Sequence, residues 1–147
     1  MTPNQLVDYV VLPEKYKNLD YLRPYYGNPE WAIRAIFSGY LGWLDGNATN
    51  LFPLSDAQEA QRIVKLAGSE DALADLIVGA INEKDYQWAA MLCDYLLSID
   101  PKNKKAMLRK ADALTALAQD KLTTTARNYY LSSAIELRKR ASALASE

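Results

Sequence analysis

The stretch from Tyr21 to Ser55, YLRPYYGNPEWAIRAIFSGYLGWLDGNATNLFPLS, constrains the fold of this chain more than any other. It holds two of the three tryptophans, both phenylalanines and four of the ten tyrosines. Asn28 can cap a helix, and Pro29 suits a first turn, where a missing N–H costs nothing. Gly46 follows Asp45 where such a helix should stop. The pattern therefore predicts a helix from about Pro29 to Asp45.

Two stripes of side chains leave this predicted helix little room for a solvent-facing side. Its large apolar residues follow the i, i+3, i+4, i+7 spacing of a helical face; they are Ile33, Ile36, Phe37, Tyr40, Leu41 and Leu44. A second stripe consists of small residues, Ala32, Ala35, Gly39 and Gly42. Because each mid-helix glycine costs about 1 kcal/mol relative to alanine, we expect another backbone or an aromatic ring to approach closely. The helix should be central and buried, and the residues expected to pack in the core or in a dimer interface are Trp31, Ile36, Phe37, Tyr40 and Trp43.

Arg34 is a single positive charge on this mostly apolar helix, and two interpretations of it are open. Glu30 lies one turn earlier, so the two side chains can form an ion pair. Alternatively, the arginine is held among aromatic residues to meet an anion or a carboxylate of a partner.

The rest of the sequence predicts further helices and no sustained strand. Thr2 and Pro3 can start a short helix within the N-terminal segment 1–20. Ser55 and Gln58 form a capping box, and Gly68 can end the helix that it opens. Ser69, Asp85 and Asn103 can begin three more helices, and Asp100-Pro101 separates the last two. The residues expected to face inward from the second and third of these four helices include Leu73, Leu76, Ile77, Ala80, Ile81, Trp88, Ala89, Leu92 and Cys93. A C-terminal helix should begin near Thr124 or Thr125, within the segment 124–147.

The antiparallel helices of residues 55–120 contain one segment with tetratricopeptide-like spacing. Asp85-Tyr86, Ala89 and Pro101 fall where a repeat of about 34 residues places its acidic-aromatic pair, small residue and closing proline. Ile77 and Ala80 stand where that repeat usually has glycine and tyrosine. We therefore predict an all-α, multi-helix bundle with one tetratricopeptide-like hairpin, in a single domain of residues 1–147.

Composition excludes several functions. The sequence has no histidine, so it lacks the commonest metal ligand and the commonest general base at neutral pH. Its one cysteine, Cys93, lies in an apolar helical run and is expected to be a buried core residue. The net charge of -1 gives no electrostatic reason to expect nucleic acid. No apolar run approaches the roughly 20 residues of a membrane span. The first residues, MTPNQLVDYVVLPEK, do not resemble a secretory signal, and the compartment is not determined.

Three segments carry a resemblance to a known family. The stretch from Tyr21 to Ser55, the segment DYQWAAMLCDYLLSIDPKNKKA (Asp85 to Ala106) and the segment ARNYYLSSAIEL (Ala126 to Leu137) resemble the α-helical dimerisation domain of alkyl sulfatases, enzymes of the metallo-β-lactamase superfamily. The resemblance covers nearly the whole chain in order. It implies a non-catalytic domain that joins two subunits of an enzyme hydrolysing alkyl sulfate esters to alcohol and sulfate.

The resemblance also implies where the chemistry lies. In alkyl sulfatases, two zinc ions are bound in a metallo-β-lactamase domain that precedes this region, and a sterol-carrier-like domain follows it. We therefore expect no catalytic residue and no metal ligand in this chain, and a homodimer with the metallo-β-lactamase domain as a second partner. The residues that we expect to face that domain, with donors suited to sulfate oxygens, are Tyr25, Tyr26, Arg34, Arg127 and Tyr129. The alternative function is a stand-alone helical adaptor that binds a peptide in a repeat-like groove.

Overall fold

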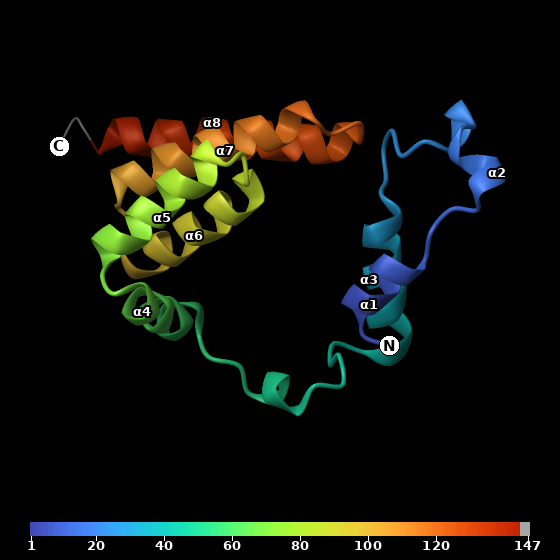
Figure 1. Cartoon of the computed structure of the whole chain (residues 1–147), viewed down its shortest axis with the longest axis horizontal. Coiled ribbons are helices and arrows are strands. Elements are labelled where there is room, and N and C mark those ends of the chain that lie inside the picture. Colours follow the sequence, from blue (N-terminus) through green and yellow to red (C-terminus); the bar gives the residue numbers. More distant parts are fainter. Residues whose placement is uncertain (145–147) are drawn as a thin grey trace. The chain divides into compact units, whose positions relative to one another are not determined.

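Capping residues set where most helices of this chain begin, as the computed structural model shows (Figure 1). The structure describes residues 1–144, and these contain no β-strand. The elements in order are α1 (Pro3–Tyr9), α2 (Glu14–Lys17), the 3-10 helix η1 (Asp20–Leu22), α3 (Pro29–Leu41), the 3-10 helix η2 (Ala48–Leu51), α4 (Asp56–Ala67), α5 (Glu70–Asn82), α6 (Tyr86–Ile99), α7 (Lys104–Gln119) and α8 (Thr124–Ala143). The all-α prediction is therefore confirmed.

The predicted caps are present as hydrogen bonds. Ser55 and Gln58 form both bonds of a capping box at the start of α4, and Thr2 and Gln5 form another at the start of α1. The side chains of Ser69, Asp85 and Asn103 each accept a backbone N–H of the helix that follows. Gly68 ends α4 with φ +105°, a conformation that favours glycine. Local hydrogen bonding thus fixes these boundaries.

The chain divides into two compact units. The first unit comprises Met1–Pro53 and Leu122–Thr125, and the second begins with Leu54–Lys121 and continues from Ala126. We describe each unit by itself. Of the predicted C-terminal helix, residues 145–147 lie outside the described residues.

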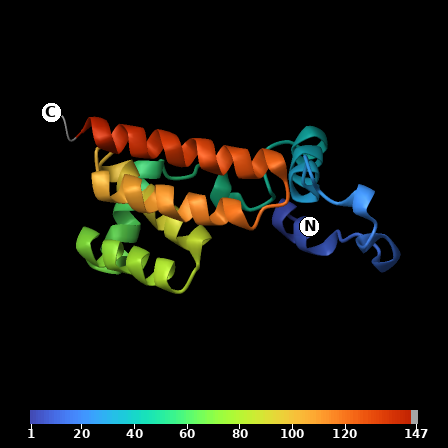
Figure 2. The same cartoon turned by 90° about the horizontal axis from the view of Figure 1, so that it is seen from above.

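The second unit contains nearly all of the buried core. Helix α6 packs against α4, α5 and α7. One cluster of buried side chains joins α5, α6 and the start of α7, and it consists of Leu73, Ile77, Leu92, Cys93, Leu96 and Ala106. A second cluster joins α7 and α8 to α5 and α6, and it includes Ala89, Met107, Ala111, Leu114, Ala134, Leu137 and Ala141. Figures 1 and 2 both show α8 lying along α7, where alanines occupy the contact.

Two inward-facing expectations for the second unit are wrong. Leu76 of α5 and Trp88 of α6 are exposed in the described chain. The neighbouring helices lie on the other side of α5 and α6. The apolar stripe of each helix is therefore wider than the face that its neighbours bury.

The first unit has much less internal packing. Helix α1 packs against α3. Phe37 is the one hydrophobic side chain that is buried among the residues of this unit, all of which the structure describes. The expectation of a central, buried α3 is therefore wrong for the single chain, because only the short helix α1 covers it.

Helix α3 also ends earlier than predicted. Its C-cap is Gly42, with φ +86°, and the Gly42 N–H donates to the carbonyl of Ser38 at 3.0 Å. Gly46 has a similar φ of +90° but lies in the loop beyond. Both glycines suit a left-handed position, and the helix ends at the first of them.

Candidate functional site

The first unit carries a large exposed apolar surface. Tyr40 is 87% exposed, Trp43 72% and Phe52 94%. The residues that make up this surface, called here the unit 1 apolar surface, are Tyr9, Val10, Val11, Tyr21, Tyr26, Trp31, Ile36, Tyr40, Leu41, Trp43 and Phe52. Single exposed hydrophobic side chains are ordinary, whereas a concentration of them marks an interaction surface or a ligand-binding groove.

Helix α3 has two different faces. At about 100° per residue, Ile33 and Phe37 lie on one side, and Phe37 is the hydrophobic residue of this unit that is buried. The opposite side holds Ala32, Ala35 and Gly39, all of them exposed, whereas the exposed Ile36 and Tyr40 flank the side of Ile33. The side with the small residues is therefore uncharged, while the exposed charged residues of α3, Glu30 and Arg34, lie nearer Phe37.

Arg34 bonds to α1 rather than to its own helix. Its Nη1 donates to Oδ1 of Asn4 at 2.6 Å. Among the described residues no ion pair joins Arg34 to Glu30, so the first of the two interpretations of Arg34 is not observed. The guanidinium instead links α3 to α1 across 30 residues of sequence, a partner that local spacing could not predict.

Tyr25 belongs to a small polar cluster at η1. Its hydroxyl donates to Oδ1 of Asp20 at 2.5 Å, and Nη1 of Arg23 lies 3.5 Å from the same oxygen. The hydrogen bond to Asp20 holds the phenol proton and raises the pKa of Tyr25 above its ordinary value. The nearby Tyr26 makes no part of this cluster and is exposed.

Two hydrogen bonds join the start of α8 and the residue before it to the segment around Pro24. The hydroxyl of Thr123, which is buried, donates to the carbonyl of Pro24 at 2.7 Å. The backbone N–H of Thr124 donates to the carbonyl of Tyr25 at 2.7 Å. These contacts fix the backbone that carries Tyr25. Sequence reasoning missed Thr123, because no local signal identifies a partner 99 residues away.

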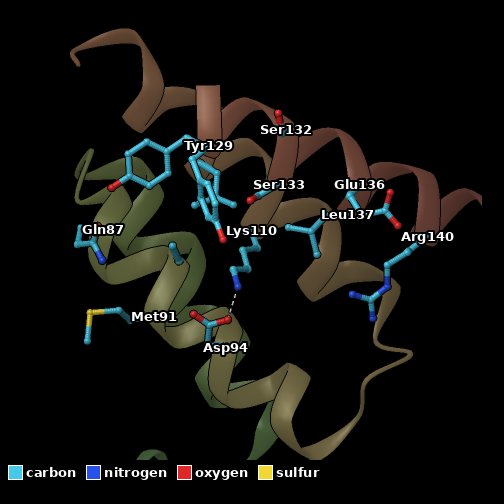
Figure 3. Close-up of a pocket in the computed structure, with 13 residues that line it drawn as sticks. Gln87, Met91, Asp94, Lys110, Tyr129, Ser132, Ser133, Glu136, Leu137 and Arg140 are labelled. Atoms are coloured by element: carbon cyan, nitrogen blue, oxygen red, sulfur yellow. Dashed lines mark hydrogen bonds and ion pairs between the residues drawn. The ribbon is translucent and has the colours of Figure 1, made fainter. Parts of the chain in front are cut away.

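The second unit has a hollow of about 620 Å³ between α6, α7 and α8 (Figure 3). Apolar side chains from all three helices line it, among them Met91, Leu114 and Leu137. Lys110 and Asp94 form an ion pair within it. Tyr129 lies at one end of this hollow and is largely exposed.

The predicted residues Arg127 and Tyr129 do not line the same hollow. Arg127 lies beside a separate depression of about 300 Å³ with Thr115, Gln119 and Leu131. Tyr25, Tyr26 and Arg34 belong to the first unit, whereas Arg127 and Tyr129 belong to the second. The structure therefore does not assemble the five predicted residues into one site within either unit.

The residues that the structure describes do not fit a zinc site. The sequence contains no histidine, and no group of three or more cysteine, aspartate or glutamate side chains is placed to hold a metal ion within residues 1–144. Burial raises the pKa of the Cys93 thiol to about 12, so this sulfur stays protonated, whereas zinc binds the thiolate.

None of the helices in the part of the chain that the structure describes combines the length and the apolar character that crossing a membrane requires.

Comparison with known proteins identifies the relatives of this chain. The sequence model of the family described as "Alkyl sulfatase dimerisation" matches residues 2–140. A linear primary-alkylsulfatase of Pseudomonas sp. (strain ATCC 19151) is 37% identical over 138 residues, which is 93% of this chain and 26% of that protein. An (R)-specific secondary-alkylsulfatase of Pseudomonas sp. is 38% identical over 127 residues, or 86% of this chain and 19% of that protein.

A solved structure shows the same fold. The stereoselective inverting sec-alkylsulfatase Pisa1 from Pseudomonas sp. superposes with a TM-score of 0.87 at 36% identity, covering 94% of this chain and 22% of that one. The chain spans about a quarter or less of the length of these relatives. The match over nearly all of its residues shows that the chain belongs to the alkyl sulfatase dimerisation family.

Proposed function

We propose that this chain joins two copies of the protein that carries it into a homodimer, and that the unit 1 apolar surface is covered by the second copy. One observation carries the proposal. The first unit exposes most of its large apolar side chains and buries only Phe37 among them. A unit of this size gains too little from its own core, so a partner surface is needed to bury the rest.

A second copy fits this surface better than a transient partner. Stable homodimer interfaces commonly bury about 2,000 Å² or more in total and are rich in apolar and aromatic residues. Tryptophan and tyrosine, which dominate interface energetics, are concentrated in the unit 1 apolar surface. A symmetric pair presents the same surface from both copies, so the apolar residues of each are covered at once.

We further propose that the complete protein is an alkyl sulfatase that hydrolyses alkyl sulfate esters to alcohol and sulfate. The alkylsulfatases in the comparison support this proposal. In this proposal, two zinc ions and the catalytic groups lie in a metallo-β-lactamase domain outside this chain. In this arrangement the chain is non-catalytic and holds two catalytic domains together.

Oligomeric state tests the first proposal. Sedimentation equilibrium of the chain at micromolar concentration should give twice the chain mass of 16.5 kDa. Tyr40→Glu places a charge in the proposed interface and should raise the Kd of the dimer about a hundredfold or more, because each copy would bury an unpaired carboxylate. Leu66→Glu is the matched control, since Leu66 is also highly exposed but lies on α4 of the second unit. A monomeric parent chain, or equal effects of both substitutions, contradicts the proposal.

Activity of the complete protein tests the second proposal. The full-length enzyme should release sulfate from a primary or secondary alkyl sulfate and should contain zinc, whereas residues 1–147 should do neither. Full-length protein that binds zinc but cleaves none of these esters contradicts the alkyl sulfatase assignment and leaves the homodimer proposal untouched.

We also propose that Tyr25, Tyr26, Arg34, Arg127 and Tyr129 face the catalytic domain in the complete enzyme and help to hold a sulfate group. Arginine and tyrosine donors suit sulfate oxygens, and the bonds from Thr123 and Thr124 hold the backbone at Pro24 and Tyr25 in place. In the complete enzyme, Arg34→Ala and Arg127→Ala should each lower kcat/KM for alkyl sulfates about tenfold or more.

The control for Arg34 is its hydrogen-bond partner. Asn4→Ala removes the same bond between α1 and α3 but keeps the guanidinium. If Asn4→Ala lowers kcat/KM as much as Arg34→Ala, the arginine acts only on the fold. Unchanged kinetics in both arginine variants would remove the proposal.

A further inference from the structure

The loop after α3 contains the one place in the sequence where a glycine follows an aspartate or an asparagine, Asp45-Gly46. It lies between the end of α3 and the start of η2. Gly46 is exposed and has φ +90°, a conformation that favours glycine. A Cβ placed on Gly46 would meet no atom within 4 Å in the described chain. No neighbouring segment therefore crowds this glycine.

An aspartate that precedes a glycine can rearrange with water as the only other reactant. The backbone nitrogen of Gly46 bonds to Cγ of Asp45, and the N–H proton and one carboxyl OH leave together as water, which closes a succinimide ring. Water then opens this ring in one of two ways. Attack at Cγ restores aspartate, whereas attack at the backbone carbonyl carbon gives isoaspartate, in which the main chain runs through the side chain. Glycine favours ring closure because it has no Cβ beside the attacking nitrogen.

Both carboxyl oxygens of Asp45 accept hydrogen bonds in the folded chain. Oδ1 accepts the backbone N–H of Asn47 at 2.9 Å, and Oδ2 accepts from Nδ2 of Asn50 at 2.8 Å. The Asp45 side chain is also half-buried. Since one of its two oxygens must leave as water, ring closure breaks at least one of these bonds, whichever oxygen departs. The two hydrogen bonds therefore oppose the first step of the rearrangement.

We infer that Asp45 is a modification site, which isomerises to isoaspartate through a succinimide with Gly46, and that the hydrogen bonds from Asn47 and Asn50 slow this reaction in the folded chain. The modification does not require the homodimer proposed above. It adds a chemical event on the loop that follows α3.

Isomerisation changes the loop that carries part of the unit 1 apolar surface. Isoaspartate adds one atom to the main chain and displaces the carboxyl group that bonds to Asn47. Asn47 is the N-cap of η2, and Trp43 and Phe52 lie before and after this region. We therefore expect faster amide hydrogen exchange over residues 42–52 in chains that contain isoaspartate than in fresh chains.

Incubation in water labelled with oxygen-18 at neutral pH measures the reaction. Opening of the succinimide adds one labelled oxygen to residue 45 in both products, so mass spectrometry of the proteolytic fragment counts every passage through the ring. The chain unfolded in guanidinium chloride should label at residue 45 about tenfold faster or more than the folded chain, because it lacks both hydrogen bonds.

Asn50→Ala tests the restraint directly. It removes the bond to Oδ2 of Asp45, so it should raise the labelling rate of the folded chain about threefold or more. The rate in guanidinium chloride should stay the same as that of the parent chain. Asn18→Ala is the matched control, since Asn18 is an exposed asparagine of the same unit and the bonds to Asp45 come from other residues. It should change neither rate.

Each contrary result overturns a stated part of the inference. Equal labelling of the folded and unfolded chains, or an Asn50→Ala rate equal to that of the parent chain, would show that the hydrogen bonds do not slow the reaction. Faster labelling of another aspartate in the folded chain would remove Asp45 as the site. A faster rate in Asn50→Ala with equally faster amide exchange throughout α3 would assign the effect to opening of the whole unit. All of these results leave the homodimer proposal untouched, because they do not measure oligomeric state.

Discussion

Cys93 lies in the core cluster of α5 and α6 with no exposed surface. Burial disfavours the thiolate, and the neighbouring Asp94 adds a like charge, so the pKa of the thiol rises from 9.0 to about 12. A thiol in this state is neither a nucleophile nor a metal ligand near neutral pH. The sequence prediction of a buried core cysteine is confirmed, and its role is packing.

The raised pKa of Cys93 predicts a loss of stability at alkaline pH. Below pH 9 the thiol is protonated in both the folded and the unfolded chain, so it adds no pH dependence. Between about pH 9 and 12 the unfolded chain releases the thiol proton while the folded chain retains it, so the free energy of unfolding falls as pH rises. Cys93→Ala should show a shallower decline over the same range in urea denaturation. Equal slopes for the parent chain and Cys93→Ala would contradict the assigned pKa.

At the scale of the helix, the N-terminal boundaries follow from caps that lie within four residues of the groups they bond. The predicted starts of α4, α5, α6 and α7 are therefore confirmed by their caps, and α8 begins at Thr124 as predicted. The predicted end of α3 was wrong by four residues, because two glycines, Gly42 and Gly46, both suit a left-handed position. Which of the two glycines ends the helix depends on the tertiary contacts along α3, and the local sequence does not specify those contacts.

The C-cap of α3 predicts different effects at two glycines. Gly42→Ala forces a Cβ into φ +86°, so it should lower the free energy of unfolding by about 1 kcal/mol or more. Gly27→Ala is the control, because Gly27 has no positive φ and a Cβ there meets open space. Chemical denaturation of both variants at one protein concentration makes the comparison. A Gly42→Ala variant as stable as Gly27→Ala would mean that α3 does not end at this residue.

At the scale of the whole molecule, the two units differ in where their stability comes from. The second unit has continuous buried clusters that join α5, α6, α7 and α8. The first unit has one buried hydrophobic side chain, Phe37, together with the bonds from Thr123 and Thr124 to the segment around Pro24. Under the homodimer proposal, we therefore expect the first unit to depend on a partner surface and the second unit to be stable without one.

This difference predicts a concentration dependence that is confined to the first unit. On dilution below the dimer Kd, amide hydrogen exchange should accelerate in α1 and α3, because their protection is linked to association. Exchange in α5, α6 and α7 should stay unchanged over the same dilution. Mass spectrometry of proteolytic fragments resolves the two sets. Uniform acceleration in both units would show that they are stabilised together.

The family assignment follows from long motifs in the sequence, and the comparisons confirm it over residues 2–140. The comparisons with known proteins do not support the alternative function, a stand-alone helical adaptor that binds a peptide. The tetratricopeptide-like character of the α5–α6 hairpin stays a prediction, as do the roles of the five residues proposed to face the catalytic domain. These roles depend on surfaces that lie outside this chain.

The sequence by itself determined the helical class and the caps, because each depends on neighbours within a few residues. The tertiary structure decided which side of each helix is covered. It placed Arg34 against Asn4, brought Thr123 to Pro24 and left Ile36, Tyr40 and Trp43 exposed. The physical reason is that an apolar stripe makes burial of a helix face favourable, whereas the surface that covers this face comes from segments that are distant in the sequence.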